Sequence, residues 1–433
     1  MKSQVLSVKL LSYNEHTETI IGSDISTTFE KESYQKRFEK KHKDKDASLA
    51  CFEINRCSHN KDEYKIKTGY FIGLDWIEEG ETAIHVTPKY NNNAVEVDYI
   101  SMLLSSLRHD SVTKEIDELF EVEWSKPNID ITQKQDLLTP FLIVEFLSLL
   151  KQIVRKGLKN SYYKVENNLY GKVKGKIQVS KTIKKNLVKS KDLFTYCSYE
   201  EFGVNNKENR LLKKALALVK GYLPTYSQLT NNKDLKNMFN YINPAFERVS
   251  DQIELSEIRN TKINVFYKEY EQALKLAKLI LKRFGYNISN TKKDSVQSPP
   301  FWIDMTKLFE LYVLGLLKDR FQNEVKFQKK YQGNELDYLL KNKDYQMVID
   351  AKYKPLYLSG VEHNDIRQVS GYARLKRVYE DLKKEKGAII DCLIIHPDLN
   401  GFEDLSNVDL KQTEIKEYHD VYKIGVKLPL IKL

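Results

Sequence analysis

A short apolar segment that runs straight into charged residues is the feature that most restricts how this chain can fold. Residues 345–349 (Tyr-Gln-Met-Val-Ile) indicate a strand, and Asp350-Ala351-Lys352 follows it directly. Side chains alternate along a strand, so Asp350 and Lys352 share one face while Ala351 points away. Charges at the end of a buried strand are costly unless they are paired or bind a metal ion. The fold must therefore bring compensating groups to this point.

A second carboxylate lies one hairpin away from this strand end. Residues 335–340 (Glu-Leu-Asp-Tyr-Leu-Leu) predict a strand, and the polar residues 341–344 predict a turn. Asp337 precedes Asp350 by 13 positions, a spacing that a hairpin can fold back. Two carboxylates and an ammonium that converge in this way can hold Mg²⁺, with Mn²⁺ as an alternative, and support phosphodiester hydrolysis.

The tripeptide Asp-x-Lys or Glu-x-Lys is not specific by itself. It also occurs at residues 381–383 and 324–326, which we interpret as helix surface and strand surface. Two flanking helices add polar groups near the better candidate. Residues 301–317 predict a helix that is apolar nearly all round but contains Glu310, which could face a metal site, form a salt bridge or be exposed. Gln368 and Tyr372 lie four positions apart on a later helix, where they share one face and line the site or form ordinary surface.

Composition places this site in a large globular chain. With 433 residues, 41% of them hydrophobic, the sequence predicts two or three domains. The net charge of +10 suits a polyanionic partner such as DNA. Four cysteines in a chain of this length do not form a disulfide scaffold. The beginning of the chain has no signal-peptide pattern, and the most apolar stretch, residues 137–154, is too short to span a bilayer. We expect a cytoplasmic protein with no membrane partner.

The order of predicted elements indicates the α/β class in a multidomain α+β arrangement. Residues 1–98 predict a strand-rich domain with a hairpin at 70–86, and the charged residues 29–46 predict a solvated helix or a loop. Residues 99–290 predict a mainly helical region, with helices over 142–153, from 207 onward and over 265–284. Residues 291–433 predict the order helix, three strands, helix, strand.

A basic segment interrupts the helical region. Residues 171–177 (Gly-Lys-Val-Lys-Gly-Lys-Ile) alternate in a way that predicts a strand with Lys172, Lys174 and Lys176 on one face. These lysines could follow a phosphate backbone, or they could form a solvated face with no ligand.

Taken together, the candidate residues resemble the core motif of the PD-(D/E)xK nucleases. In that family the order helix, three strands, helix, strand carries such a set. The resemblance implies that Asp337, Asp350, Glu310 and the backbone carbonyl of Ala351 hold the metal ion. It implies that Lys352 orients water or stabilises the transition state. It implies that Gln368 and Tyr372 line the site or contact DNA, and we expect Lys354 to contact DNA as well.

A series of shorter motifs runs through the rest of the chain. In order they are residues 84–89 (Ile-His-Val-Thr-Pro-Lys), residues 169–177, Glu200-Glu201-Phe202 followed by residues 207–212 (Lys-Glu-Asn-Arg-Leu-Leu), residues 304–310 and residues 350–354. This order resembles that of the McrC subunits of McrBC and LlaJI-type restriction systems, from Ile84 to Tyr372.

The second resemblance implies the endonuclease subunit of a GTP-dependent restriction system directed at 5-methylcytosine. Such a subunit cuts DNA and stimulates a separate McrB-like AAA+ GTPase hexamer, on which residues 1–98 are expected to dock. The chain contains no Gly-x-x-x-x-Gly-Lys-Ser/Thr loop, so we expect it to bind no nucleotide itself.

Two other functions stay open at this point. The chain could be a non-catalytic subunit that only assembles with and stimulates a GTPase. The intact set Asp337, Asp350 and Lys352 argues against that reading. It could also be a partner-independent PD-(D/E)xK repair nuclease or resolvase, against which the long region before residue 287 argues.

Overall fold

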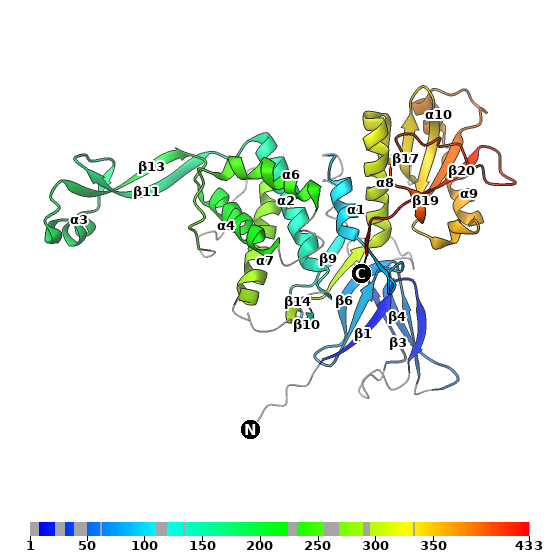
Figure 1. Cartoon of the computed structure of the whole chain (residues 1–433), viewed down its shortest axis with the longest axis horizontal. Coiled ribbons are helices and arrows are strands. Elements are labelled where there is room, and N and C mark those ends of the chain that lie inside the picture. The colour runs from blue at the N-terminus through cyan, green and yellow to red at the C-terminus, as the bar shows by residue number, and fades with distance from the viewer. Residues whose placement is uncertain are drawn as a thin grey trace. The chain divides into compact units, whose positions relative to one another are not determined.

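The computed structural model describes residues 8–21, 31–38, 50–60, 63–109, 119–132, 135–223, 232–254, 268–288, 295–331 and 334–432. The chain is mixed α and β, as the sequence predicts, and it divides into two compact units (Figure 1). One unit combines Met1–Phe141 with Lys292–Leu433, and the other is Leu142–Thr291. The three domains expected over 1–98, 99–290 and 291–433 stay a prediction.

Two sheets from the beginning of the chain share one core in the first unit. The first sheet has the order β1 (Lys9–Asn14), β7 (Thr82–Thr87), β6 (Phe71–Glu78), β15 (Phe301–Asp304), β9 (Phe120–Val122). The second has the order β2 (Glu18–Ile21), β5 (Tyr64–Thr68), β4 (Ala50–Arg56), β3 (Ser33–Arg37). Apolar side chains such as Phe52, Ile66 and Trp302 pack between them. The antiparallel β6–β7 hairpin confirms the prediction for residues 70–86.

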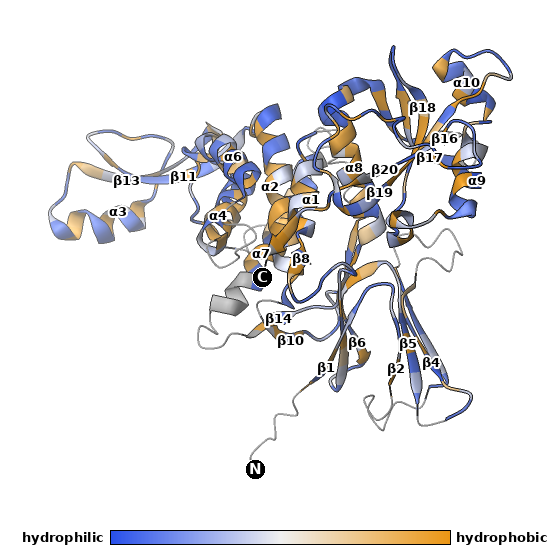
Figure 2. Cartoon of the chain, turned by 45° about the vertical axis from the view of Figure 1, so that its right-hand side comes forward, coloured by the Kyte–Doolittle hydropathy of each residue, from blue (hydrophilic) through white to orange (hydrophobic). Residues whose placement is uncertain are grey.

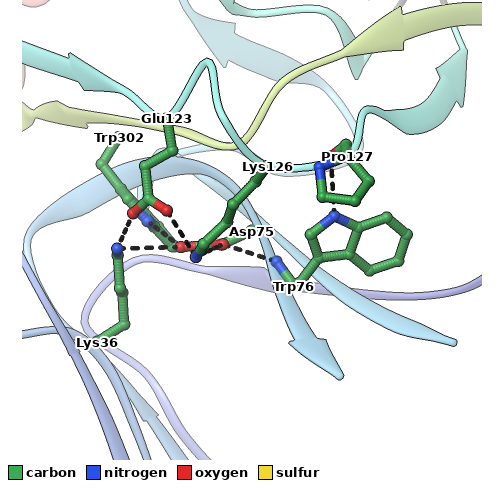
Figure 3. A network of polar contacts seen from close by, with 7 residues as sticks. All are labelled: Lys36, Asp75, Trp76, Glu123, Lys126, Pro127 and Trp302. Carbon is green, nitrogen blue, oxygen red and sulfur yellow. Dashed lines mark hydrogen bonds and ion pairs between the residues drawn. The ribbon is translucent and has the colours of Figure 1, made fainter. Parts of the chain in front are cut away.

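The prediction of a solvated helix or loop over residues 29–46 is wrong where the structure describes it, because residues 33–37 form β3. This strand buries Lys36, which pairs with Asp75 and Glu123 (Figure 3). The fully buried Asp75 also accepts hydrogen bonds from Trp302 Nε1 at 3.1 Å and the Trp76 amide at 2.8 Å. Lys126 Nζ lies 3.3 Å from the same carboxylate. The charges compensate each other, so the strand can carry a lysine into the core.

A mixed five-stranded sheet dominates the end of the chain. Its order is β16 (Val325–Tyr331), β17 (Asn334–Lys341), β18 (Gln346–Ala351), β19 (Asp391–Phe402), β20 (Val421–Val426). The first two pairings are antiparallel and the last two parallel. The associated helices are α8 (Met305–Phe321), η10 (Gln322–Glu324), η11 (Pro355–Leu358), α9 (His363–Tyr372) and α10 (Lys376–Leu382).

The helix predicted to begin at residue 301 begins at Met305 instead. Residues 301–304 form β15, which pairs with β6 on one side and β9 on the other. Asp304 then caps the helix by accepting a hydrogen bond of 3.0 Å from the Lys307 amide. After this correction the elements follow the predicted order of helix, three strands, helix and strand.

Smaller elements complete the first unit. Helix α1 (Tyr99–Ser106) packs closely on α8 at Gly315, where an added Cβ would lie 3.0 Å from the Ser105 carbonyl oxygen. Two short antiparallel pairs join β8 (Val95–Val97) to β21 (Leu430–Lys432) and β10 (Ile129–Thr132) to β14 (Ser295–Ser298). Within the described residues, no helix has both the length and the apolar character needed to cross a bilayer.

The second unit consists of helices and one long ribbon. The helices are α2 (Leu138–Lys156), α4 (Lys207–Tyr222), α6 (Lys233–Ile242), η7 (Asn243–Phe246) and α7 (Lys268–Ile288). Helix α4 begins as predicted, with Asn206 accepting from the Asn209 amide at 3.0 Å. Helix α7 confirms the helix expected over 265–284 from residue 268 on, while residues 265–267 lie outside the described part of the chain.

The ribbon pairs β11 (Ser161–Tyr170) with β13 (Phe194–Gly203), and Figure 1 shows α3 (Val179–Lys185) at its far end. Between α3 and β13 lies η5 (Leu187–Lys189). Figure 2 shows apolar segments on α3. Val179 and Ile183 of this helix are exposed.

The strand predicted over residues 171–177 is mostly a turn. Only Lys176–Ile177 forms a strand, β12, which pairs with β13. Gly171 and Gly175 take left-handed conformations, with φ of 59° and 69°. At Gly175 an added Cβ would lie 2.6 Å from the Ser198 carbonyl oxygen, so the turn requires glycine there. These two positions break the alternation from which the strand was predicted.

Candidate active site

The β17–β18 hairpin brings the two predicted carboxylates together. Its register pairs Tyr338 with Ile349, and one further step along this register sets Asp337 opposite Asp350. Asp337 Oδ2 accepts a hydrogen bond of 2.9 Å from the Ala351 amide, so the two strand ends are tied at this point. Asp350 is buried and Asp337 half-buried. Two acids therefore meet in a region that is largely closed to water.

This environment disfavours two negative charges. Burial, followed by the charges of Asp350 and Glu310, raises the pKa of Asp337 well above its ordinary value. Burial also raises the pKa of Asp350, although Lys352 opposes the shift. A cation placed between these carboxylates would relieve both effects, since it supplies the charge that the acids lack.

Lys352 lies just beyond β18, where its amide donates to the Ile395 carbonyl of β19 at 2.9 Å. Its Nζ is 2.8 Å from Asp350 Oδ2 and donates to Gln368 Oε1 at 2.9 Å. Gln368 Nε2 in turn donates to the Tyr372 hydroxyl at 2.8 Å. Burial acts to lower the pKa of Lys352, but Asp350 and the neighbouring acids outweigh it and raise the pKa above the ordinary value. The side chain is therefore a fixed cation and not a base at neutral pH.

Glu310 lies on α8, half-buried, with Lys307 Nζ 3.5 Å from its Oε2. Its backbone carbonyl accepts a hydrogen bond of 2.6 Å from the Tyr338 hydroxyl, which fixes α8 against β17. Its charge contributes to the raised pKa of Asp337, so it lies close enough to act on that acid. Of the three alternatives open for Glu310, exposure on the helix surface is wrong.

One member of this cluster, Asp365, was not predicted as a site residue. It is buried at the start of α9 and lies 2.8 Å from Lys354 Nζ and 3.9 Å from Lys352 Nζ. The Tyr357 hydroxyl donates to it at 2.8 Å. Asp365 precedes Gln368 by three positions on one helix, and that spacing is the signal that could have revealed it. Lys354, expected to contact DNA, is thus held by an internal ion pair.

The donor set fits a hard divalent cation. Asp337, Asp350, Glu310 and the Ala351 carbonyl offer oxygen ligands only, as Mg²⁺ prefers, and Mg²⁺ commonly keeps several waters when one or two carboxylates hold it. The raised pKa values of the two aspartates agree with a site that is completed by positive charge. Across the described residues, no three His, Cys, Asp or Glu side chains gather into a ready-made metal cage. In this geometry Asp337 and Asp350 are the two carboxylates nearest each other, and Glu310 would complete a Mg²⁺ site only together with bound water.

The remaining predicted residues, Lys172, Lys174 and Lys176, belong to the other compact unit. All three are exposed at the turn between β11 and β12. Lys174 Nζ lies 3.0 Å from Glu201 and 4.0 Å from the centre of the Tyr199 ring, so part of its charge is already compensated.

Comparison with known proteins adds a family to this geometry. A family model described as "McrBC 5-methylcytosine restriction system component" matches residues 66–382, a range that contains every residue of the cluster around Asp350. No curated protein matches the chain.

Two solved structures from Thermococcus gammatolerans are similar. One is a refined half-complex from a tetradecameric assembly of McrB AAA+ hexamers with bound McrC; it is 14% identical, with 96% of this chain and 94% of that chain covered, at a TM-score of 0.37. The other is a cryo-EM structure of the McrBC complex; it is 16% identical, with 71% and 87% covered, at a TM-score of 0.28.

Proposed function

The chain belongs to the family of McrBC 5-methylcytosine restriction system components, and from this premise we propose that it is the DNA-cutting subunit of such a system. The proposal rests on one observation above all. Asp337, Asp350 and the cationic Lys352 converge at the end of β18, tied by hydrogen bonds of 2.9 Å from Ala351 to Asp337 and from Lys352 to Gln368. Hydrolysis of a phosphodiester needs these groups: acids that hold a metal ion and a cation near the reacting phosphate.

Each residue has a defined part in this proposal. Asp337, Asp350, Glu310 and the Ala351 carbonyl would hold Mg²⁺ or Mn²⁺, which when bound supplies Lewis-acid activation of water and phosphate. Lys352 stays protonated and stabilises the negative charge that develops on the phosphate. Gln368 orients the Lys352 amine and is itself fixed by Tyr372. Gln368 and Tyr372 would contact the DNA backbone, and so would the half-buried Lys354, which also pairs with Asp365.

We extend the proposal to the partner. The family description and the motifs between Ile84 and Tyr372 support an McrB-like AAA+ GTPase as partner. We propose further that this chain stimulates the GTPase and docks on it through residues 1–98. The nucleotide would bind to that partner, since this sequence carries no phosphate-binding loop. The exposed Lys172, Lys174 and Lys176 would add contacts to DNA phosphates.

A plasmid cleavage assay with Mg²⁺ tests the function. It compares the chain alone with the chain plus an McrB-like GTPase and GTP, each with wild-type protein and with Lys352→Ala. Cutting that needs partner and GTP and is lost in the variant is the expected result. Cutting by the chain alone would favour a partner-independent nuclease. Faster GTP hydrolysis without any cutting would favour a non-catalytic stimulating subunit.

A further inference from the structure

Two residues from the beginning of the chain meet beyond the ends of neighbouring strands. β1 and β7 run parallel, with Asn14 beside Thr87. The residues that follow them, Glu15 and Pro88-Lys89, therefore emerge at the same edge of the sheet. The Glu15 amide donates to the Thr87 carbonyl at 2.8 Å, and Glu15 Oε1 accepts from the Lys89 amide at 3.2 Å. The Pro-Lys motif noted in the sequence thus belongs to a defined local structure.

Both residues hold Tyr353, which is 264 positions further along the chain than Lys89. Lys89 Nζ donates to the Tyr353 carbonyl at 2.7 Å and lies 3.4 Å from the centre of its ring. The Tyr353 hydroxyl donates to Glu15 Oε1 at 2.7 Å. The backbone, the ring face and the hydroxyl of one tyrosine are therefore all fixed by the first sheet.

The surroundings of this contact are closed and aromatic. Glu15 is fully buried, and the rings of Tyr70 and Tyr90 lie 4.6 and 5.6 Å from Lys89 Nζ. Burial lowers the pKa of Lys89 to about 8, although Glu15 opposes the shift. Burying ionisable groups costs free energy, so Glu15 and Lys89 are better explained by a role in fixing one conformation than by a gain in stability.

Tyr353 separates two lysines of the cluster at Asp350. Tyr353 lies at a tight turn, in which the Lys354 amide donates to the Lys352 carbonyl at 2.8 Å. Lys352 and Lys354 both face Asp365, while Tyr353 faces Glu15 and Lys89. A displacement of Tyr353 must therefore displace Lys352.

We propose that Glu15 and Lys89 are positioning residues, which hold Tyr353 and so fix the Lys352 ammonium between Asp350 and Gln368. The effect on catalysis rests on the proposed nuclease function. The place of the Lys352 ammonium between Asp350 and Gln368 does not depend on that function. A measurement that does not depend on DNA cutting can therefore test the positioning of Lys352 separately.

The experiment measures how fast reductive methylation modifies Lys352 in the full chain, by peptide mass spectrometry, with the exposed Lys326 as internal reference. The variants are Tyr353→Phe, which removes only the hydroxyl, Lys89→Met, which removes the cation, and Lys89→Arg, which keeps it. The matched control is Lys36→Met. It removes another buried lysine of the same unit, whose partners are Asp75 and Glu123 and not Tyr353.

We expect methylation of Lys352 to be several-fold faster in Tyr353→Phe and Lys89→Met, near the wild-type rate in Lys36→Met, and partly restored in Lys89→Arg. In cleavage assays kcat should fall about tenfold or more with little change in KM, since small misplacements of a reacting group have effects of this order. Wild-type methylation rates in both Tyr353→Phe and Lys89→Met would overturn the proposal, and so would an equal increase in Lys36→Met. If Lys89→Met does not fold, Tyr353→Phe decides alone. A wild-type chain that cuts no DNA would refute the nuclease function and leave the methylation result to decide the positioning role.

Discussion

Asp337 lies across the β17–β18 hairpin from Asp350, with its Oδ2 2.9 Å from the amide nitrogen of Ala351. A carboxylate that accepts a hydrogen bond from the backbone beside the other carboxylate cannot turn away from it without losing that bond. The two acids are thus held near each other by the strand pairing itself. Burial raises the pKa of both, and for Asp337 the charge of Asp350 adds to the shift.

Replacing either charge at the end of β18 should abolish DNA cutting. We expect Asp350→Ala and Lys352→Ala to lower kcat by about a thousandfold or more, as removal of a group that acts on the transition state commonly does. Supercoiled plasmid with Mg²⁺, GTP and the partner is the assay. Lys326→Ala, an exposed lysine on β16 of the same sheet, is the control and should cut normally. Normal cutting by both site variants would show that Asp350 and Lys352 are not catalytic residues.

Mg²⁺ affinity should fall as the pH falls. Protons compete with the metal for carboxylates, and the raised pKa of Asp337 and Asp350 extends this competition to a higher pH than for exposed acids. Isothermal titration calorimetry from pH 8 downward measures the effect. Asp337→Asn should bind Mg²⁺ weakly, whereas Glu335→Gln, exposed on the same strand, should match the wild type. An affinity that is independent of pH would contradict a carboxylate site.

His85 should make the fold sensitive to acid. It is buried on β7 at 3% exposure, and burial lowers its pKa to about 4. The unfolded chain takes up this proton near pH 6.5 and the folded chain only near pH 4. The free energy of unfolding should therefore fall as the pH drops through this window, by about 1.4 kcal/mol per unit and about 3 kcal/mol in all. Urea unfolding at several pH values should show that the free energy of unfolding depends less on pH in His85→Gln than in the wild type. An equal pH dependence in both proteins would contradict this expectation.

The lysines at the β11–β12 turn should contribute to DNA binding through charge alone. The triple variant Lys172→Ala, Lys174→Ala, Lys176→Ala should weaken binding and reduce the slope of log K against log salt by about 2. We do not expect the larger reduction in salt slope that three phosphate contacts would give, because Lys174 already pairs with Glu201. Changing Lys220, Lys233 and Lys236, exposed lysines on α4 and α6, removes the same charge elsewhere in that unit. Equal salt slopes for both triple variants would show the turn lysines to be ordinary surface.

The sequence was most informative where structure is local. The proximity of Asp337 and Asp350 depends on one hairpin, and the alternation that places Lys352 beside Asp350 depends on one strand, so both could be predicted from spacing. Strand β15 could not, because four apolar residues adjoining an apolar helix look like its first turn until their strand partners are known.

Contacts between residues that are far apart in the sequence could not be predicted from the spacing of residue types. Nothing near Lys36 in the sequence shows that Asp75 and Glu123 will compensate it in the core. Nor does the sequence around Tyr353 show that Glu15, 338 positions away, will bind its hydroxyl. The lysine alternation at residues 171–177 predicts a strand, but the left-handed conformations of Gly171 and Gly175 make most of this segment a turn.

Strand β15 also has a consequence for how this protein can change in evolution. Its four residues come from just before α8, yet they fill the sheet between β6 and β9, strands from the first third of the chain. Without it both strands would have open edges, so neither segment of that unit is a module that recombination could transfer by itself. Residues 142–291 are in a different position, since they form a compact unit of their own between the two segments of the first unit. The inserted helices and ribbon are therefore the part that can be remodelled as one piece, while the two segments joined at β15 must be inherited together.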